Sequence, residues 1–118
     1  MIEKKFKHAS ASEAGDYFQV LFEDEADNIY KPYFLIQRQF EDSDDDHFYL
    51  ESDDSKFCGD FNINAATLSR EYLCLDLSAA KKNLLWVKFD TDPDTYGEIK
   101  RILKIMFQDK ILHLSKDC

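Results

Sequence analysis

The fold is decided by two neighbouring segments, Tyr33-Phe34-Leu35-Ile36-Gln37-Arg38-Gln39 and His47-Phe48-Tyr49-Leu50-Glu51-Ser52. Both are rich in the aromatic and branched aliphatic residues that favour strands. The first is apolar at nearly every position before Gln37, which is typical of a central strand covered on both faces. The second alternates, so that Phe48 and Leu50 share one side. Two such segments in succession predict a β-hairpin.

The tip of this hairpin is unusually acidic. The stretch 41–54 contains neither Lys nor Arg, and its eight carboxylates are Glu41, Asp42, Asp44, Asp45, Asp46, Glu51, Asp53 and Asp54. A carboxylate that leaves water without a partner loses several kcal/mol, so this tip cannot be buried alone. It is therefore solvated, holds a cation, or faces a positively charged partner.

Other strand-like segments lie on both sides of the hairpin. They are residues 17–22, 57–64, 72–77 and 85–90. Between the last two, Ser78 can cap a short helix at residues 79–84. The first sixteen residues are polar and predict a loose lead-in or a short edge element. Trp86, between two aliphatic residues, is expected in the core, and Arg38 is expected to pair with a local carboxylate.

The clearest single element is a C-terminal helix at residues 93–108. Asp92 supplies its N-cap and Pro93 its first turn. The apolar positions that follow recur at helical spacing, and they are Ile99, Ile102, Leu103, Met106 and Phe107. The tail at 111–114 either extends this helix or adds a short strand.

These elements predict one α+β domain spanning residues 1–118. A mainly antiparallel sheet of about six strands occupies residues 17–90, and the C-terminal helix packs against it together with the one short helix. A chain of 118 residues is long enough to bury a sizeable core.

The net charge of −9 limits the classes of partner. A domain this acidic repels nucleic acid and anionic membranes, and its encounter with basic partners is accelerated. Its three cysteines (Cys58, Cys74 and Cys118) do not have zinc-site spacing. The N-terminal residues lack the apolar segment of a signal peptide, and no apolar run is long enough to span a membrane. We therefore expect a cytoplasmic protein that binds neither nucleic acid nor membrane.

Two kinds of chemistry were weighed against this composition. Asp42, Asp44 and Asp46 have the spacing of the first ligands of an EF-hand loop, and Asp53 falls at its twelfth position. However, His47 occupies the sixth position, where that loop requires Gly. A calcium- or ligand-binding module that uses the 41–54 turn is the alternative function. No pattern of a nucleophile, a paired acid and base or a phosphate loop indicates an enzyme, and no cofactor is expected.

The order of features from Tyr33 onward resembles the Immunity protein 10 family, small bacterial proteins that neutralise polymorphic toxins. The residues that carry the resemblance are Tyr33–Gln39, Tyr49-Leu50-Glu51, Cys58-Gly59, the step Leu73-Cys74-Leu75-Asp76-Leu77-Ser78-Ala79-Ala80, residues 87–92 and the helix to Phe107. The chain departs from the family where Cys58-Gly59 stands in place of two glycines. It also lacks a Gly-Met step in the hairpin.

This resemblance implies a non-enzymatic function, in which the protein inhibits a cognate toxin domain by binding it in the cytoplasm. Toxins that cut nucleic acid present a basic cleft, which an acidic turn can occupy as a phosphate mimic. The expected contact residues are Glu41, Asp42, Asp44, Asp45 and Asp46, with Tyr30, Tyr33 and Tyr49 as aromatic anchors.

Overall fold

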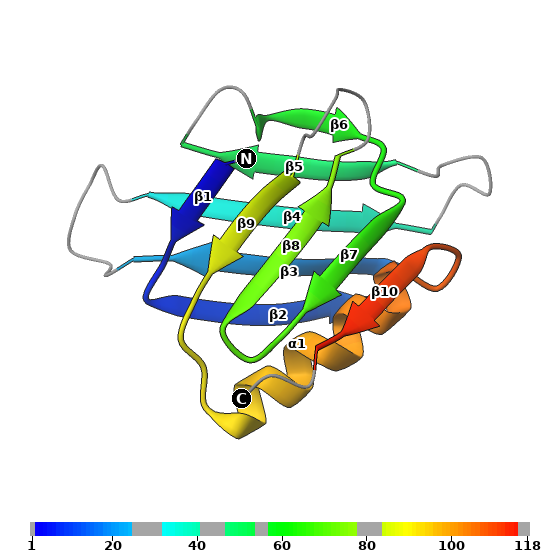
Figure 1. Cartoon of the computed structure of the whole chain (residues 1–118). Coiled ribbons are helices and arrows are strands. Elements are labelled where there is room, and N and C mark those ends of the chain that lie inside the picture. The colour runs from blue at the N-terminus through cyan, green and yellow to red at the C-terminus, as the bar shows by residue number, and fades with distance from the viewer. Residues whose placement is uncertain (1, 25–31, 41–46, 54–56, 78–83, 116–118) are drawn as a thin grey trace.

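The described chain forms two five-stranded sheets and one helix (Figure 1). The computed structural model describes residues 2–24, 32–40, 47–53, 57–77 and 84–115. Sheet A contains, in spatial order, β1 (Ile2–Lys5), β9 (Leu84–Lys88), β8 (Tyr72–Asp76), β7 (Ala65–Leu68) and β10 (Ile111–Leu114). Sheet B contains β2 (His8–Ala14), β3 (Tyr17–Glu23), β4 (Tyr33–Gln39), β5 (Phe48–Ser52) and β6 (Gly59–Phe61). The helix is α1 (Pro93–Met106).

The two sheets lie face to face, with the strands of sheet A running obliquely across those of sheet B (Figure 1). Every pairing between neighbouring strands is antiparallel except β1 with β9 and β7 with β10. The predicted α+β class with mainly antiparallel strands is therefore confirmed. The prediction of a single sheet of about six strands differs from the structure, because the chain passes from β6 at the edge of sheet B to β7 in sheet A, and the described strands form two sheets of five.

The core lies between the sheets and is unusually aromatic. Phe22 of β3 packs on Phe89, which follows β9, with 5.0 Å between ring centroids. Phe48 of β5 packs on Phe107, at the end of α1, at 4.6 Å. These rings join elements far apart in sequence, so both sheets and the helix share one continuous core.

The N-terminal residues take part in both sheets. β2 pairs with β3 across a two-residue turn at Gly15 and Asp16, and the φ of Gly15 is 62°. Glycine suits this turn because it adopts positive φ without a steric penalty. β1 pairs in parallel with β9, and Phe6, between β1 and β2, is buried in the core. The expectation of a loose lead-in is wrong, and its alternative of an edge element holds for β1 and β2.

The helix confirms its prediction closely. It begins at Pro93, and the Asp92 carboxylate accepts a hydrogen bond from the Thr95 amide at 2.7 Å. This bond to the charged carboxylate holds the pKa of Asp92 below its ordinary value. The predicted apolar stripe is buried, and the helix lies mainly against β2 and β3 of sheet B (Figure 1).

Arg38 fastens the end of this helix to sheet B. Its buried guanidinium donates to the Met106 carbonyl at 2.6 Å and to both oxygens of Asp109, at 2.7 and 3.0 Å. The guanidinium also lies 4.8 Å from the ring centroids of Phe40 and Phe48. The expectation of a local carboxylate partner is wrong, because Asp109 is 71 residues away in the sequence.

Two further expectations concern the tail and the residues before β9. The tail at 111–114 is a strand, β10, and not an extension of the helix. Leu84 opens β9, so it does not end a short helix, and the remaining residues of that expected helix lie outside the described residues.

Candidate functional site

The outer face of sheet B is uncovered and polar, whereas its inner face is the core. Along β3, β4 and β5, buried and half-buried residues alternate strictly. The outward positions of β3 to β6 are Tyr17, Gln19, Leu21, Glu23, Tyr33, Leu35, Gln37, Gln39, Tyr49, Glu51 and Asp60. The expectation that residues 33–39 are covered on both faces is therefore wrong. No second layer lies over this side within the described residues.

The strand register places these side chains in rows across the sheet. Gln19, Gln37, Tyr49 and Asp60 stand directly opposite one another on four successive strands. In the next row, Leu35 lies opposite Glu51. Neighbours of this kind on one face are close enough for their side chains to interact. The rows therefore give the face a fixed pattern of amide, phenol and carboxylate groups.

Glu51 joins two tyrosines at the centre of this face. The hydroxyl of Tyr33 donates to its Oε2 at 3.0 Å, and the hydroxyl of Tyr49 donates to its Oε1 at 2.8 Å. All three side chains are half-buried. Because each carboxylate oxygen accepts one phenol, the carboxylate cannot rotate without breaking a hydrogen bond. We refer to Tyr33, Glu51 and Tyr49 as the Tyr–Glu–Tyr cluster.

The cluster keeps both phenols in their protonated form. The pKa of Tyr49 is raised, first by its hydrogen bond to Glu51 and then by partial desolvation. The pKa of Tyr33 is raised first by desolvation and then by its hydrogen bond to Glu51. Phenols titrate near pH 10 in water, so an upward shift removes any tendency to ionise at neutral pH. Each phenol donates its one O–H to Glu51, so its oxygen remains available only as an acceptor.

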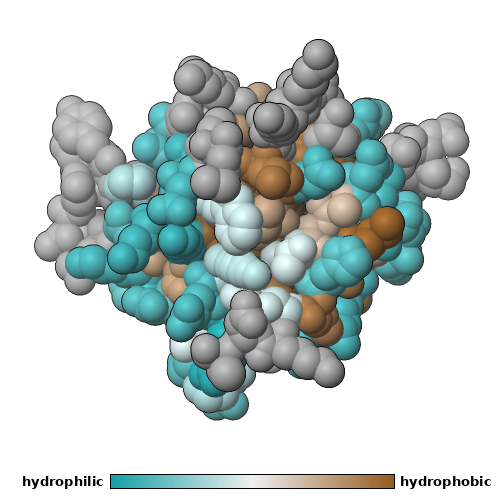
Figure 2. Space-filling view, viewed as in Figure 1, coloured by the Kyte–Doolittle hydropathy of each residue, from teal (hydrophilic) through white to brown (hydrophobic). Residues whose placement is uncertain are grey.

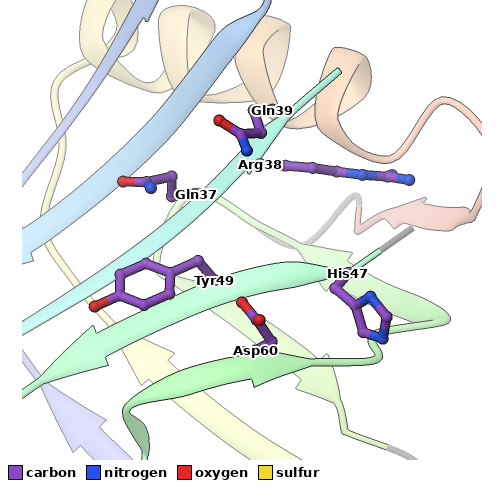
Figure 3. A pocket seen from close by; sticks show the side chains of 6 residues that line it. All are labelled: Gln37, Arg38, Gln39, His47, Tyr49 and Asp60. Atoms are coloured by element: carbon purple, nitrogen blue, oxygen red, sulfur yellow. The ribbon is translucent and has the colours of Figure 1, made fainter. Parts of the chain in front are cut away.

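A polar hollow of about 240 Å³ adjoins the cluster (Figure 3). It is lined by Gln37, Arg38, Gln39, His47, Tyr49 and Asp60. Gln37, Tyr49 and Asp60 come from three neighbouring strands, and the side chain of Arg38 extends away from them (Figure 3). The hollow lies where β4 ends and β5 begins, which is where the acidic segment 41–46 connects the two strands.

The position of Asp53 contradicts the EF-hand interpretation. Asp53 lies beyond the far end of β5, where its carboxylate accepts a hydrogen bond from the Tyr33 amide at 3.2 Å. A five-residue strand is roughly 17 Å long, so it separates Asp53 from His47. Ca²⁺ ligands lie only about 2.3–2.6 Å from the ion. An EF-hand loop would have to curve round the ion at positions 48–52, where the chain forms an extended strand, and the expected ligands Asp42, Asp44 and Asp46 lie outside the described residues.

The sequence identified part of this site. The structure brings together Tyr33 and Tyr49, which were expected as aromatic anchors. The other expected contact residues, Tyr30, Glu41, Asp42, Asp44, Asp45 and Asp46, lie outside the described residues. Glu51 was missed as the centre of the cluster. The alternation of the second strand could have revealed it, because Tyr49 and Glu51 are two residues apart and share a face.

The outer face of sheet A has a different character. An apolar groove of about 410 Å³ crosses it, lined by Ala65, Ala66, Thr67, Tyr72, Cys74, Asp76, Leu84 and Trp86. Pale and brown side chains mark the middle of this face, and hydrophilic residues surround them (Figure 2). Trp86 is half-buried and stacks on Tyr72 with 4.9 Å between centroids. The expectation of a core position for Trp86 is therefore wrong, because alternation along β9 places Leu85 and Val87 inside.

Within the part of the chain that the structure describes, no three His, Cys, Asp or Glu side chains are grouped to hold a metal ion. The same residues contain no helix with both the length and the apolar character needed to cross a membrane. In comparisons with known proteins, the chain matches no family model, no curated protein and no solved structure.

Proposed function

We propose that the chain is a non-enzymatic immunity protein, which binds a cognate bacterial toxin domain in the cytoplasm and thereby neutralises it. The observation that carries this proposal is the Tyr–Glu–Tyr cluster on the uncovered face of sheet B. The resemblance of Tyr33–Gln39 and its flanking segments to Immunity protein 10 supports the same function.

The chemistry of the cluster suits binding. Tyrosine concentrates binding energy at interfaces, because it offers a large rigid ring together with a hydroxyl. On this face the rings of Tyr33 and Tyr49 are half-buried and held by Glu51, so little side-chain freedom remains to be lost on association. The glutamines and the carboxylate around them supply the polar contacts that reversible interfaces contain.

The acidic connection between β4 and β5 adds a long-range contribution. Residues 41–46 contain five carboxylates and no base, and they join the two strands that carry the cluster. A basic toxin surface would be attracted to this end of sheet B before contact is made. Such attraction raises the association rate and weakens with added salt. A toxin that acts on nucleic acid, whose cleft is basic, is the partner that fits this charge best.

The test is co-expression with a toxin domain encoded beside this chain's own gene. The C-terminal domain of a neighbouring large secreted protein is expressed in a bacterial host, alone and together with this chain. We expect growth arrest by the domain alone, restored growth on co-expression, and a stable complex of the two purified proteins. A neighbouring domain whose growth arrest this chain does not relieve, or a gene without such a neighbour, would contradict the proposal.

A further inference from the structure

The charge of sheet B is one-sided. Its five strands contain no lysine, and their one arginine, Arg38, points into the core and pairs with Asp109. The same strands contain four carboxylates: Glu13, Glu23, Glu51 and Asp60. The charge of Glu13 is neutralised by a salt bridge with Arg101 of α1. The outward face of these strands therefore carries carboxylates and no lysine or arginine.

Sheet A differs in this respect. Its strands contain Lys4, Lys5 and Lys88 against the carboxylates Glu3 and Asp76. On its edge, Lys88 pairs with Glu3 at 3.1 Å. The groove on this sheet is lined mainly by apolar groups. A basic partner is therefore attracted to sheet B and not to sheet A.

Glu51 retains the capacity to bind a cation. Each oxygen of a carboxylate offers two acceptor sites, and one site on each is taken by a phenol. One site on each oxygen is left, and the two phenols fix the direction in which these sites point. Among the described residues, no lysine or arginine forms a salt bridge with Glu51. The carboxylate is thus held in one orientation, and no lysine or arginine of the described residues pairs with it.

We propose that the outer face of sheet B is the docking surface for a basic protein partner, and that Glu51 receives an arginine guanidinium from that partner. Tyr33 and Tyr49 are positioning residues, which hold the carboxylate and border the arriving side chain. This inference rests on the proposed function in so far as the partner is a toxin domain. It also locates the contact on the sheet itself and not only on the acidic segment 41–46.

Arginine fits this arrangement better than lysine. A guanidinium is planar and forms two parallel hydrogen bonds with the two oxygens of one carboxylate. It also stacks on aromatic rings, and two tyrosine rings border Glu51. The ammonium group of lysine is a compact charge that cannot satisfy both oxygens with the same geometry. Discrimination between the two bases is therefore a signature of the site.

The experiment titrates the full ¹⁵N-labelled chain with acetyl-arginine amide, acetyl-lysine amide and the neutral isostere acetyl-citrulline amide. We expect the arginine probe to shift the amide signals of β4 and β5 saturably, with a dissociation constant on the order of 10 mM. The lysine probe should bind several-fold more weakly, and citrulline should not saturate. Glu51→Gln should abolish the saturable shifts, whereas Glu3→Gln on sheet A should leave them unchanged.

A second readout separates positioning from general structural support. An arginine bound to Glu51 offsets the negative charge that raises the pKa of Tyr49. The probe should therefore lower this pKa, which is measured from the ¹³Cζ shift of Tyr49. Tyr49→Phe should weaken arginine binding several-fold while the chain stays folded. Equal binding of the three probes, shifts spread over both sheets, or full binding by folded Glu51→Gln would overturn the inference.

The toxin domain then distinguishes this inference from the proposed function. If the chain neutralises the toxin but Glu51→Gln does so equally well, the docking surface is wrong and the immunity function stands. If the arginine probe binds at Glu51 but the toxin is not neutralised, the surface stands and the proposed function is wrong.

Discussion

At the scale of single residues, Glu51 organises the exposed face of sheet B. Its two oxygens accept from phenols on two different strands, so one carboxylate fixes the side chains of both β4 and β5. All three groups remain partly in contact with water, where such hydrogen bonds add little to stability. Their main consequence is order, because a face with fixed donors and acceptors loses less entropy when a partner binds.

The two tyrosines should respond differently when Glu51 is changed. The hydrogen bond to Glu51 is the first cause of the raised pKa of Tyr49, whereas desolvation is the first cause for Tyr33. We therefore expect Glu51→Gln to lower the pKa of Tyr49 more than that of Tyr33, as measured from the ¹³Cζ shifts of labelled tyrosine. Equal changes for both phenols would show that the cluster is not arranged as described.

The same shifts give a pH dependence of stability. A raised pKa means that the folded state favours the neutral phenol, so this contribution is complete below pH ~10. It is lost as the pH rises through the raised pKa values of Tyr33 and Tyr49. We expect the urea midpoint to fall less steeply above pH ~10 in the variant with both tyrosines changed to Phe than in wild type. Parallel curves would contradict this assignment.

The buried guanidinium of Arg38 pairs with the half-exposed carboxylate of Asp109. We expect Asp109→Asn to lower the free energy of unfolding by about 1–3 kcal/mol, because a buried guanidinium loses its charged acceptor. Urea unfolding measures this loss, and Glu71→Gln at an exposed position is the control. Hydrogen bonds from Arg38 hold the pKa of Asp109 below its ordinary value. This stabilisation is present above pH ~4, and acid should remove it in wild type but not in Asp109→Asn.

At the scale of elements, the sequence pattern predicted which segments are helical or extended, but it did not predict which faces of the strands are covered. The helix was predicted to within two residues of its end, since its N-cap, its proline and its apolar stripe are local signals. For β4, the run Tyr33-Phe34-Leu35-Ile36 suggested burial on both faces, yet only Phe34 and Ile36 are in the core. Tyrosine and leucine are compatible with a half-exposed face, so composition alone could not decide between the two.

Long-range pairing was the second limit of prediction. The sheet to which a strand belongs depends on distant pairing partners that a local pattern does not reveal. β6 and β7 illustrate this, because they follow one another along the chain and belong to different sheets. The polar sequence of residues 1–16 likewise concealed two strands, because both lie at sheet edges where polar side chains remain in water. The tyrosines of the candidate site were accessible from sequence, but the partner that joins them was not.

The structural role of the N-terminus can be tested directly. Phe6 is buried and packs on Phe22 with 6.3 Å between ring centroids. We expect Phe6→Ala to lower the free energy of unfolding by about 3–5 kcal/mol, and Lys5→Ala next to it to change it by less than about 0.5 kcal/mol. If thermal or urea unfolding showed equally small losses of stability for both variants, the expectation that the N-terminal residues form a loose lead-in would be correct.

The length of β5 leads to a prediction about calcium. Residues 48–52 form an extended strand that ends at Asp53, so the described part of the 42–53 stretch is not the curved loop that an EF-hand requires. We expect 1 mM Ca²⁺ to leave the melting temperature unchanged. A native-state site with a dissociation constant of about 10 µM would instead add ~2.7 kcal/mol at that concentration. A rise of several degrees, absent with Mg²⁺, would revive the calcium-binding alternative.

At the scale of the whole molecule, the two sheets present faces of different chemistry. Sheet A offers an apolar groove, with the Lys88–Glu3 salt bridge at its edge. The outer face of sheet B offers tyrosines, amides and carboxylates but no lysine or arginine. The acidic segment 41–46 joins β4 and β5 of sheet B along the chain. Such a distribution orients a basic partner during approach and favours one docking face.

The measurement that tests the central claim most directly is the affinity of the purified toxin domain for three folded proteins: wild type, Glu51→Gln and Glu3→Gln. If the partner's arginine docks on Glu51, then Glu51→Gln should weaken binding by at least ~30-fold, mainly through faster dissociation. Glu3→Gln, the same chemical change on the outer face of sheet A, should bind within about twofold of wild type. Equal affinity of Glu51→Gln and wild type at low and moderate salt would contradict the account.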